Sequence, residues 1–483
     1  MKRFLSILLA TALTLSLTAC DMADNSPEDS TEGSGTESTE QTQPEVNIPD
    51  AGLTDLSPKA ATYSGIACGT ESGMYYMDQM INRGDGTLMY IDYATQNEVY
   101  VCSDSSCKHD SDRCTSYFSS SEFFINRNSI IFSYGGSLFY LNLNGFNEGG
   151  AGTQPPIRED EERVQALYRM NTDGSDRRRV YTFDEGLAVD AFAAGDGNYL
   201  WFYVRTPIVK FNEKTKMYYS DSKNKAIIKL DLSDYTVVEQ IPLKNSDRIS
   251  NYNICGCFGD KFIFSVGVYP EGITSEDIFE MRTDVDPSVI PEGSDPRLNE
   301  IDENTDNVYF TLDKTTKETK EIFRCSGKDR YALNCFYNGE IMYAYNYNDS
   351  SLIEINMLNG GKTTRDPLPL PDGYAVSRMY DGKFLCVHAE REIETIYFFD
   401  PLTNEITKSD LRSPAWPDTA IDSSVVAFGS DYVLILGEEK TIENKHFGTG
   451  GYYYGYYVMT IDDFFNGVDK LEPVKINERE DMK

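Results

Sequence analysis

Two sequence patterns alternate along most of the chain and constrain its fold more than any other feature. The first is a turn rich in Gly, Asn and Asp followed by a run of β-branched and aromatic residues, seen at 125–134, 193–204, 258–266, 336–345, 379–388 and 427–436. The second is an apolar run, a polar turn and another strand-like run, seen at 88–102, 167–181, 227–241, 308–323, 352–366, 396–410 and, in degenerate form, 456–474. Each pattern predicts a β-hairpin, so each alternating pair predicts four antiparallel strands.

The spacing of these units favours one architecture. The equivalent residues Asn356 and Asp400 are separated by one repeat, within the roughly 40–50 residues of a propeller blade. We therefore expect an all-β fold, a single β-propeller of about seven (six to eight) four-stranded antiparallel blades. A pair of β-sandwiches is the alternative, but it explains the short strands and not the alternation of two turn types.

One repeat supports a more specific comparison. The segment LYRMNTDGSDRRRVY at 167–181 resembles the repeat of TolB-like propellers and of related uncharacterised propellers in exported bacterial lipoproteins. As a looser pattern the resemblance extends over most of 75–476. It implies the fold, but propellers serve as enzymes, scaffolds and sensors, so it implies no activity.

The N-terminus has the features of an export signal. Lys2 and Arg3 precede an apolar run, and the run ends in Leu17-Thr18-Ala19-Cys20, which resembles the lipobox of bacterial lipoproteins. The resemblance implies a signal peptide at 1–19 and a lipid, such as palmitate, on Cys20. We therefore expect an extracytoplasmic protein, anchored by its N-terminal lipid to the cell membrane and exposed at the cell surface.

Composition divides the rest of the chain in two. Residues 20–58 are acidic and rich in Ser, Thr and Glu, which predicts a disordered tether, and 59–483 is then the propeller domain. The net charge of −34 argues against nucleic acid as a partner, because nucleic acid is itself a polyanion.

Long inserts predict a working face. The segments 145–163, 205–225, 268–307 and 437–455 each fall between the second and third strands of a unit, so they should crowd one face of the disc. That face favours a non-enzymatic module that binds an extracellular peptide, glycan or protein partner. Its candidate ligand-binding residues are tyrosines set among glycines, whose rings suit stacking but also suit packing between blades: Tyr452, Tyr453, Tyr454 and Tyr456.

A cluster of cysteines with a histidine is the clearest candidate site. Cys102, Cys107, His109 and Cys114 follow the outer strand of the first unit and should lie on the same working face. Three thiols and one imidazole form a ligand set for zinc, although the spacing matches no common zinc finger. Disulfides and redox activity are the alternatives, and the nine cysteines left after Cys20 cannot all pair. No other cofactor is indicated.

A second group of thiols is expected near the channel. Cys255 and Cys257 should point to one side of an innermost strand, and Cys335 should occupy the equivalent place in the next blade.

Motifs for hydrolysis are absent from the sequence, which has neither G-x-S-x-G nor H-E-x-x-H. The sequence therefore favours a protein without enzymatic activity. The alternative is a surface glycan-active or other hydrolytic propeller, since 78 acidic residues leave a pair of catalytic carboxylates open. Metal binding by the Cys/His segment is a third possibility.

Overall fold

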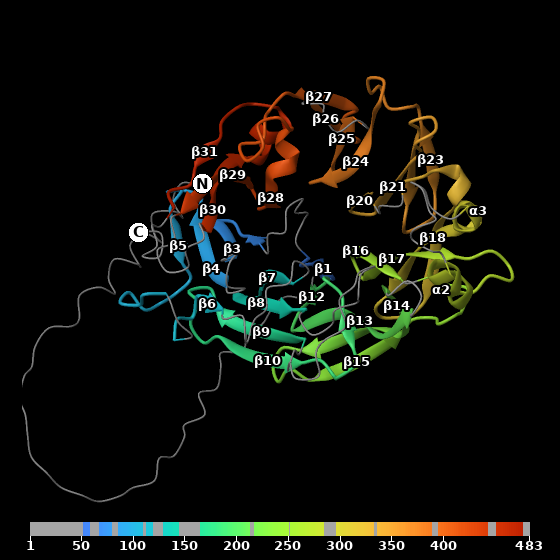
Figure 1. The fold of residues 1–483 in the computed structure, drawn as a ribbon, viewed down its shortest axis with the longest axis horizontal. Coiled ribbons are helices and arrows are strands. Elements are labelled where there is room, and N and C mark those ends of the chain that lie inside the picture. Colours follow the sequence, from blue (N-terminus) through green and yellow to red (C-terminus); the bar gives the residue numbers. More distant parts are fainter. Residues whose placement is uncertain are drawn as a thin grey trace, which may run out of the picture. The chain divides into compact units, whose positions relative to one another are not determined.

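Seven antiparallel sheets follow one another along the chain, each built as a meander (Figure 1). The computed structural model describes residues 52–57, 67–79, 86–109, 113–118, 129–143, 165–212, 217–250, 252–284, 296–332, 336–388, 395–442 and 451–476. These residues belong to one unit, 46–483. The fold is a seven-bladed β-propeller, as predicted.

The strands of each blade run in chain order from the innermost to the outermost. Blade 1 contains β2 (Ala67–Gly69), β3 (Gly73–Gln79), β4 (Gly86–Asp92), β5 (Glu98–Tyr100) and the added β6 (Tyr117–Phe118). Blade 2 contains β7 (Ile130–Tyr134), β8 (Ser137–Asn142), β9 (Ala166–Asn171) and β10 (Arg178–Thr182). Blade 3 contains β12 (Ala194–Asp196), β13 (Tyr199–Asn212), β14 (Met217–Asp231) and β15 (Val237–Pro242), joined by β1 (Thr54–Asp55) and β11 (Ala188–Val189).

The remaining four blades have the same construction. Blade 4 contains β16 (Asn253–Phe258), β17 (Lys261–Val268), β18 (Asp306–Asp313) and β19 (Thr319–Ser326). Blade 5 contains β20 (Phe336–Asn338), β21 (Ile341–Tyr345), β22 (Leu352–Asn356) and β23 (Lys362–Arg365). Blade 6 contains β24 (Tyr374–Tyr380), β25 (Lys383–His388), β26 (Ile396–Asp400) and β27 (Glu405–Ser409). Blade 7 contains β28 (Val425–Phe428), β29 (Tyr432–Ile442), β30 (Gly451–Thr460) and β31 (Glu472–Pro473).

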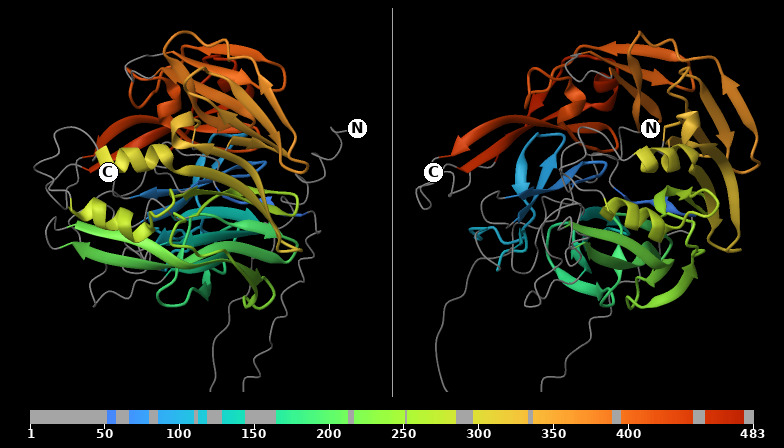
Figure 2. Two further views of the ribbon diagram at one scale, coloured as in Figure 1. Left: turned by 90° about the vertical axis from the view of Figure 1, so that its right-hand side faces the viewer. Right: turned by 45° about the vertical axis from the view of Figure 1, so that its right-hand side comes forward.

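The core of the propeller is divided among the interfaces between blades. Seven hydrophobic clusters each join two successive blades, and one of them joins blade 7 to blade 1. Side chains on a strand alternate between two such clusters: Phe262 and Phe264 pack toward blade 3, whereas Ile263 packs toward blade 5. Because both faces of each sheet are buried, the central strands read as continuous apolar runs. The clusters close the blades into the ring seen in Figures 1 and 2.

Among the described residues the ring closes without exchange of a strand between the first and last blades, since the described strands of blade 7 lie in 425–473. The C-terminal segment 472–475, which we call the clasp, instead touches both blades. Pro473 pairs with Tyr457 of β30, and Lys475 forms a parallel bridge with Asn97, next to β5. The clasp therefore joins the outer edges of blades 7 and 1.

Strand β1 was not predicted. Thr54 pairs with Gly195 of β12, so that blade 3 has an additional innermost strand. Asp55 accepts a hydrogen bond from the hydroxyl of Tyr337 in blade 5 (3.1 Å). Gly256 makes room for this contact, because a Cβ there would lie 1.9 Å from the Tyr337 oxygen. Residues 52–57 thus belong to the propeller, whereas the sequence placed them in the tether.

The long inserts differ from the loops that the sequence predicted. Insert 205–225 extends β13 and β14 into a long hairpin, and 437–455 similarly extends β29 and β30. Their alternating residues continue the ladder instead of leaving it. Insert 268–307 contains α2 (Ser275–Asp284) and α3 (Pro296–Asn304), and a short helix, α4 (Ile461–Phe465), follows β30. Insert 145–163 lies outside the described residues.

In blade 2 the first turn also lies later than expected. It is formed by Gly135 and Gly136, both with positive φ, between β7 and β8. The sequence had placed this turn near residue 126. No helix in the described part of the chain is long and apolar enough to cross a membrane.

Candidate metal centre

The Cys/His segment is an excursion from the outer strand of blade 1. Strand β5 pairs with Met89–Ile91 of β4, and β6 continues the same edge by pairing with Gly86 and Thr87. Leu88, between them, accepts a hydrogen bond from the N–H of Val101 (3.1 Å) and donates one to the carbonyl of Ser116 (2.7 Å). The described residues 102–109 and 113–115 therefore belong to one excursion, here called the Cys/His loop, inserted at one register position. The segment follows the outer strand β5, as predicted, but the sequence did not predict that β6 would then return to β4.

Blade 2 holds the base of the Cys/His loop in place. The guanidinium of Arg177 donates hydrogen bonds to the carbonyls of Thr115 (2.9 Å) and Tyr117 (2.5 Å) and lies over the ring of Phe118. On the other side of the base, Gly174 approaches so closely that a Cβ there would lie 2.0 Å from the Val101 carbonyl oxygen. Both ends of the loop are thus fixed by the turn between β9 and β10.

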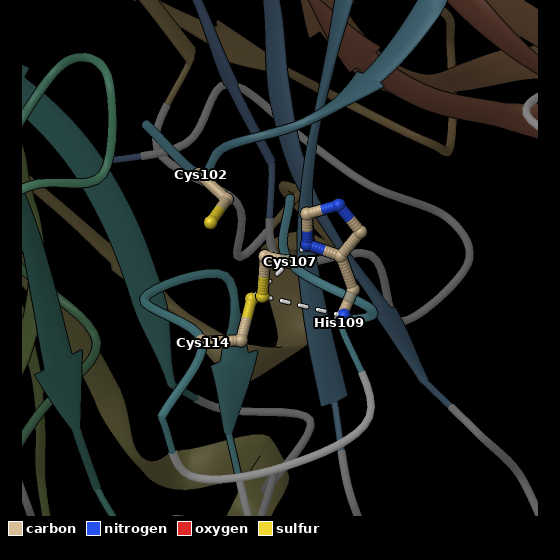
Figure 3. Close-up of side chains that lie close together, drawn as sticks. All are labelled: Cys102, Cys107, His109 and Cys114. Carbon is tan, nitrogen blue, oxygen red and sulfur yellow. Dashed lines mark hydrogen bonds between the residues drawn. The ribbon is translucent and has the colours of Figure 1, made fainter. Parts of the chain in front are cut away.

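The four predicted ligands converge within this loop (Figure 3). One ligand atom from each of Cys102, Cys107, His109 and Cys114 lies within 4.8 Å of all the others. In a tetrahedral zinc site, two sulfurs at about 2.3 Å from the metal are about 3.8 Å apart. The separations in the cluster are therefore close to those of such a site. The cluster can hold a metal ion.

Hydrogen bonds and a ring contact already orient the ligands. The Nδ1 atom of His109 lies 3.2 Å from the sulfur of Cys114, and the backbone N–H of His109 donates to the sulfur of Cys107 (3.4 Å). His109 can make both contacts because its backbone is left-handed, with φ of 57°. Its imidazole stacks on the ring of Tyr100, with centroids 3.8 Å apart and planes 12° apart. Such contacts around a ligand set its orientation before metal binds.

The thiols of the loop have different electrostatic environments. For Cys102, burial acts to raise the thiol pKa, but hydrogen bonding to the backbone of Asp104 and to neighbouring side chains lowers the pKa below its usual value. Cys114 is fully buried, and this burial raises the pKa of its thiol. A bound divalent cation favours the thiolate form of each cysteine ligand. It would therefore offset the free-energy cost of ionising the buried Cys114 thiol.

The other described cysteines do not form a comparable site. None of the eight described cysteines is in a disulfide. A β-bulge at Cys255 reverses the direction of its side chain, so Cys255 packs toward blade 5 and Cys257 toward blade 3. The expectation that they share one side of the strand is therefore wrong. Cys335 lies outside the described residues.

The predicted ligand-binding tyrosines lie on β30, and two of them have described side chains. Tyr456 packs against Tyr76 of blade 1, with ring centroids 4.8 Å apart. The Tyr454 hydroxyl donates to Glu439 (3.3 Å), and its ring packs on the same interface between blades 7 and 1. The side chains of Tyr452 and Tyr453 are outside the described set, as is Cys20.

Sequence reasoning found the ligands but missed the residues that support them. Gly174 and Arg177 share one turn of blade 2 that is distant from Tyr100 along the chain, and only the packing of blade 2 against blade 1 brings this turn to the loop. The glycine in the turn of 167–181 was a signal, since a turn glycine can mark a close backbone approach.

Gly174→Ala is expected to destabilise the base of the Cys/His loop. Gly174 has φ of +81°, so alanine would add backbone strain as well as a clash with the Val101 carbonyl. Gly186→Ala is the matched control, because Gly186 has φ of +83° and open space around its Cβ position. Gly174→Ala should lower the free energy of unfolding by about 1–3 kcal/mol more than Gly186→Ala. Equal losses in denaturant titrations would contradict the close approach.

Comparison with known proteins finds similarity only to solved structures, at low identity. No protein-family model matches the sequence, and a search of curated proteins finds no match. Among solved structures, a puromycin-hydrolyzing peptidase of Mycobacterium tuberculosis is 10% identical with a TM-score of 0.45, over 90% of this chain and 55% of that one. An acylaminoacyl peptidase of Pyrococcus horikoshii is 10% identical with a TM-score of 0.41, over 88% of this chain and 53% of that one. The chain therefore spans about half the length of these peptidases.

A third structure is similar over nearly its whole length. The β-propeller domain of the Trilobed protease from Pyrococcus furiosus, described as having an open velcro topology, is 10% identical with a TM-score of 0.41. The match covers 90% of this chain and 98% of that domain. At this identity and TM-score the likeness assigns no function, and the propeller fold rests on the seven sheets described above.

The comparisons also correct the functional prediction. A non-enzymatic binding module was the main expectation, with an enzyme disfavoured. Several of the similar structures are peptidases, which counts against that expectation and leaves the hydrolytic alternative closer, but at 10–12% identity the likeness gives this chain no activity. The prediction was wrong because the absence of G-x-S-x-G and H-E-x-x-H from the sequence was taken as evidence against enzymatic activity.

Proposed function

We propose that the protein binds one Zn²⁺ ion through Cys102, Cys107, His109 and Cys114, and that this ion organises the outer edge of blade 1. The observation that carries the proposal is the convergence of four ligand atoms within 4.8 Å. Three thiolates and one imidazole are a common ligand set of structural zinc sites. Thiolate-rich sites disfavour magnesium and calcium, which prefer oxygen ligands.

A structural role follows from the number of protein ligands. Four side chains fill the tetrahedral positions of zinc, whereas a catalytic site leaves one position for water or substrate. Cys114 is fully buried and the other three ligands are half-buried, so the ion would be largely shielded from solvent. Binding would restrain the described residues of the loop, 102–109 and 113–115, among which few backbone hydrogen bonds are present.

Metal analysis tests this function. Protein purified under reducing conditions and supplied with zinc is expected to contain one zinc per chain. Cys107→Ser and His109→Ala should each lose it, because either change removes one of four ligands. Cys386→Ser is the matched control, since Cys386 is buried between blades 5 and 6, away from the loop. Zinc retained by both ligand variants, or no zinc in the wild type, would contradict the proposal.

We also propose that the propeller is held outside the cytoplasmic membrane by lipid on Cys20, through the tether formed by the residues after it. The lipobox-like sequence Leu17-Thr18-Ala19-Cys20 supports this proposal. Labelling of cells with a palmitate analogue should mark the wild type and not Cys20→Ala. Equal labelling of the two would contradict lipidation at this cysteine.

Hydrolysis of a peptide or a glycan is the second candidate function, and it is proposed only as a class of reaction. The fold likeness assigns neither a substrate nor a catalytic residue. Screening the purified protein against peptide and glycan libraries tests this candidate. Turnover by the wild type and by zinc-free Cys107→Ser alike would place hydrolysis apart from the metal centre, whereas no turnover would count against an enzyme.

A further inference from the structure

We propose that zinc at the Cys/His loop strengthens the closure of the propeller ring, by coupling that loop to the C-terminal clasp through strand β5. The inference rests on the proposed zinc binding and adds a role for it. The interface between blades 7 and 1, here called the seam, has no exchanged strand in the part of the chain that the structure describes. Its outer edge is joined by the clasp.

The clasp binds one end of the short segment that contains β5. The backbone N–H of Lys475 donates to the carbonyl of Gln96 (2.9 Å), and the N–H of Glu98 donates to the carbonyl of Lys475 (3.1 Å). The side chains of Gln96 and Glu472 also hydrogen-bond (2.6 Å). These contacts tie 472–475 to residues 96–98 of blade 1.

The metal centre begins at the other end of the same segment. Tyr100 is the last residue of β5 and stacks on His109, and Cys102 follows two residues later. Strand β5 has only three paired residues with β4, so its own ladder holds it weakly. Ordering of Tyr100 and Cys102 by bound zinc would therefore restrain the strand on which the clasp pairs.

Buried contacts connect β5 to the rest of the seam. The carboxylate of Glu98 is buried and accepts a hydrogen bond from the hydroxyl of Tyr76. Tyr76 in turn packs against Tyr456 of blade 7. Displacement of β5 would thus disturb both the clasp and an aromatic pair across the seam.

Coupling of this kind is reciprocal. If zinc stabilises the clasp, the intact clasp must raise the affinity for zinc by the same factor. Lys475→Pro removes the N–H that donates to Gln96 and should weaken zinc binding about tenfold, within the usual range of such couplings. Lys475→Ala is the matched control, because it keeps both backbone hydrogen bonds and removes only the ammonium contact with Thr95.

Zinc affinity is measured by competition with a chromophoric chelator, and amide hydrogen exchange is followed in the wild type with and without zinc. We expect slower exchange in 96–101 and 472–476 when zinc is bound, and weaker zinc binding in Lys475→Pro than in Lys475→Ala. The exchange measurement needs no variant, so it tests the coupling even if Lys475→Pro does not fold.

The outcomes separate the two proposals. If the wild type binds no zinc, the metal centre itself is wrong and the coupling falls with it. A second outcome is that zinc binds and slows amide exchange in the Cys/His loop, while exchange in 472–476 is unchanged and both variants bind zinc with equal affinity. In that case the metal centre is correct and only the coupling is wrong.

Discussion

Removal of zinc is expected to lower the free energy of unfolding by about 4 kcal/mol, compared with protein held at a free zinc concentration about 1,000 times its dissociation constant. The reason is that the four ligands converge only in the folded chain, since Cys102 and Cys114 are brought together by the return of β6 to β4. Denaturant titrations with and without a chelator measure the difference.

The control for this experiment is Cys107→Ser, in which the chelator should have no effect because the site is already incomplete. Wild type that loses its zinc to the chelator without a change in the denaturation midpoint would contradict a stabilising role. Destabilisation of Cys107→Ser by the chelator would place the responsible metal elsewhere.

Phe384→Ala is expected to lower the free energy of unfolding by about 3–5 kcal/mol. Phe384 is fully buried on β25 and touches the rings of Phe336, Tyr343 and Phe399, so alanine would leave a cavity between blades 5 and 6. Leu402→Ala is the control from the same blade, because Leu402 is 73% exposed. Its effect should stay within about 0.5 kcal/mol.

Denaturant titrations of the two variants provide the measurement. Similar small losses for both would mean that the interface between these blades is not the tightly packed core described above. A large loss for Phe384→Ala alone would support the division of the core into seven interfaces.

The fold could be predicted from the sequence because every blade of a propeller repeats the same local pattern of strands and turns. Turn residues between apolar runs mark each hairpin, and the alternation of two turn types gives the unit of four strands. The runs at 261–266 and 341–345 are continuous because their strands are buried on both faces. These are local signals, and the structure confirmed the architecture that they predicted.

Features that depend on contacts between residues far apart in the sequence could not be predicted. Strand β1 is two residues long and has no pattern of its own, and it exists because the edge of β12 accepts it. The bulge that turns Cys255 away from Cys257 has no distinctive residue other than the glycine between these two cysteines. In the insert at 437–455, by contrast, the tyrosines did indicate packing between blades, and the extension of β29 and β30 agrees with that interpretation.

The candidate site shows the same division. Ligand types and their order along the chain identified Cys102, Cys107, His109 and Cys114, because metal sites need those types within one short loop. The return of the chain to β4 through β6 was not predicted, since that pairing comprises only two residues. The connection of the loop to the clasp required the register between Asn97 and Lys475, which the sequence does not reveal.

X-ray absorption at the zinc edge tests the central claim most directly, because it reports the atoms that surround the metal. For the zinc-loaded wild type we predict three sulfur ligands at about 2.3 Å and one nitrogen ligand at about 2.0 Å. In His109→Ala that retains residual zinc, the nitrogen should be replaced by oxygen while the three sulfurs remain. A wild-type spectrum dominated by oxygen ligands would contradict the Cys/His loop as the metal centre.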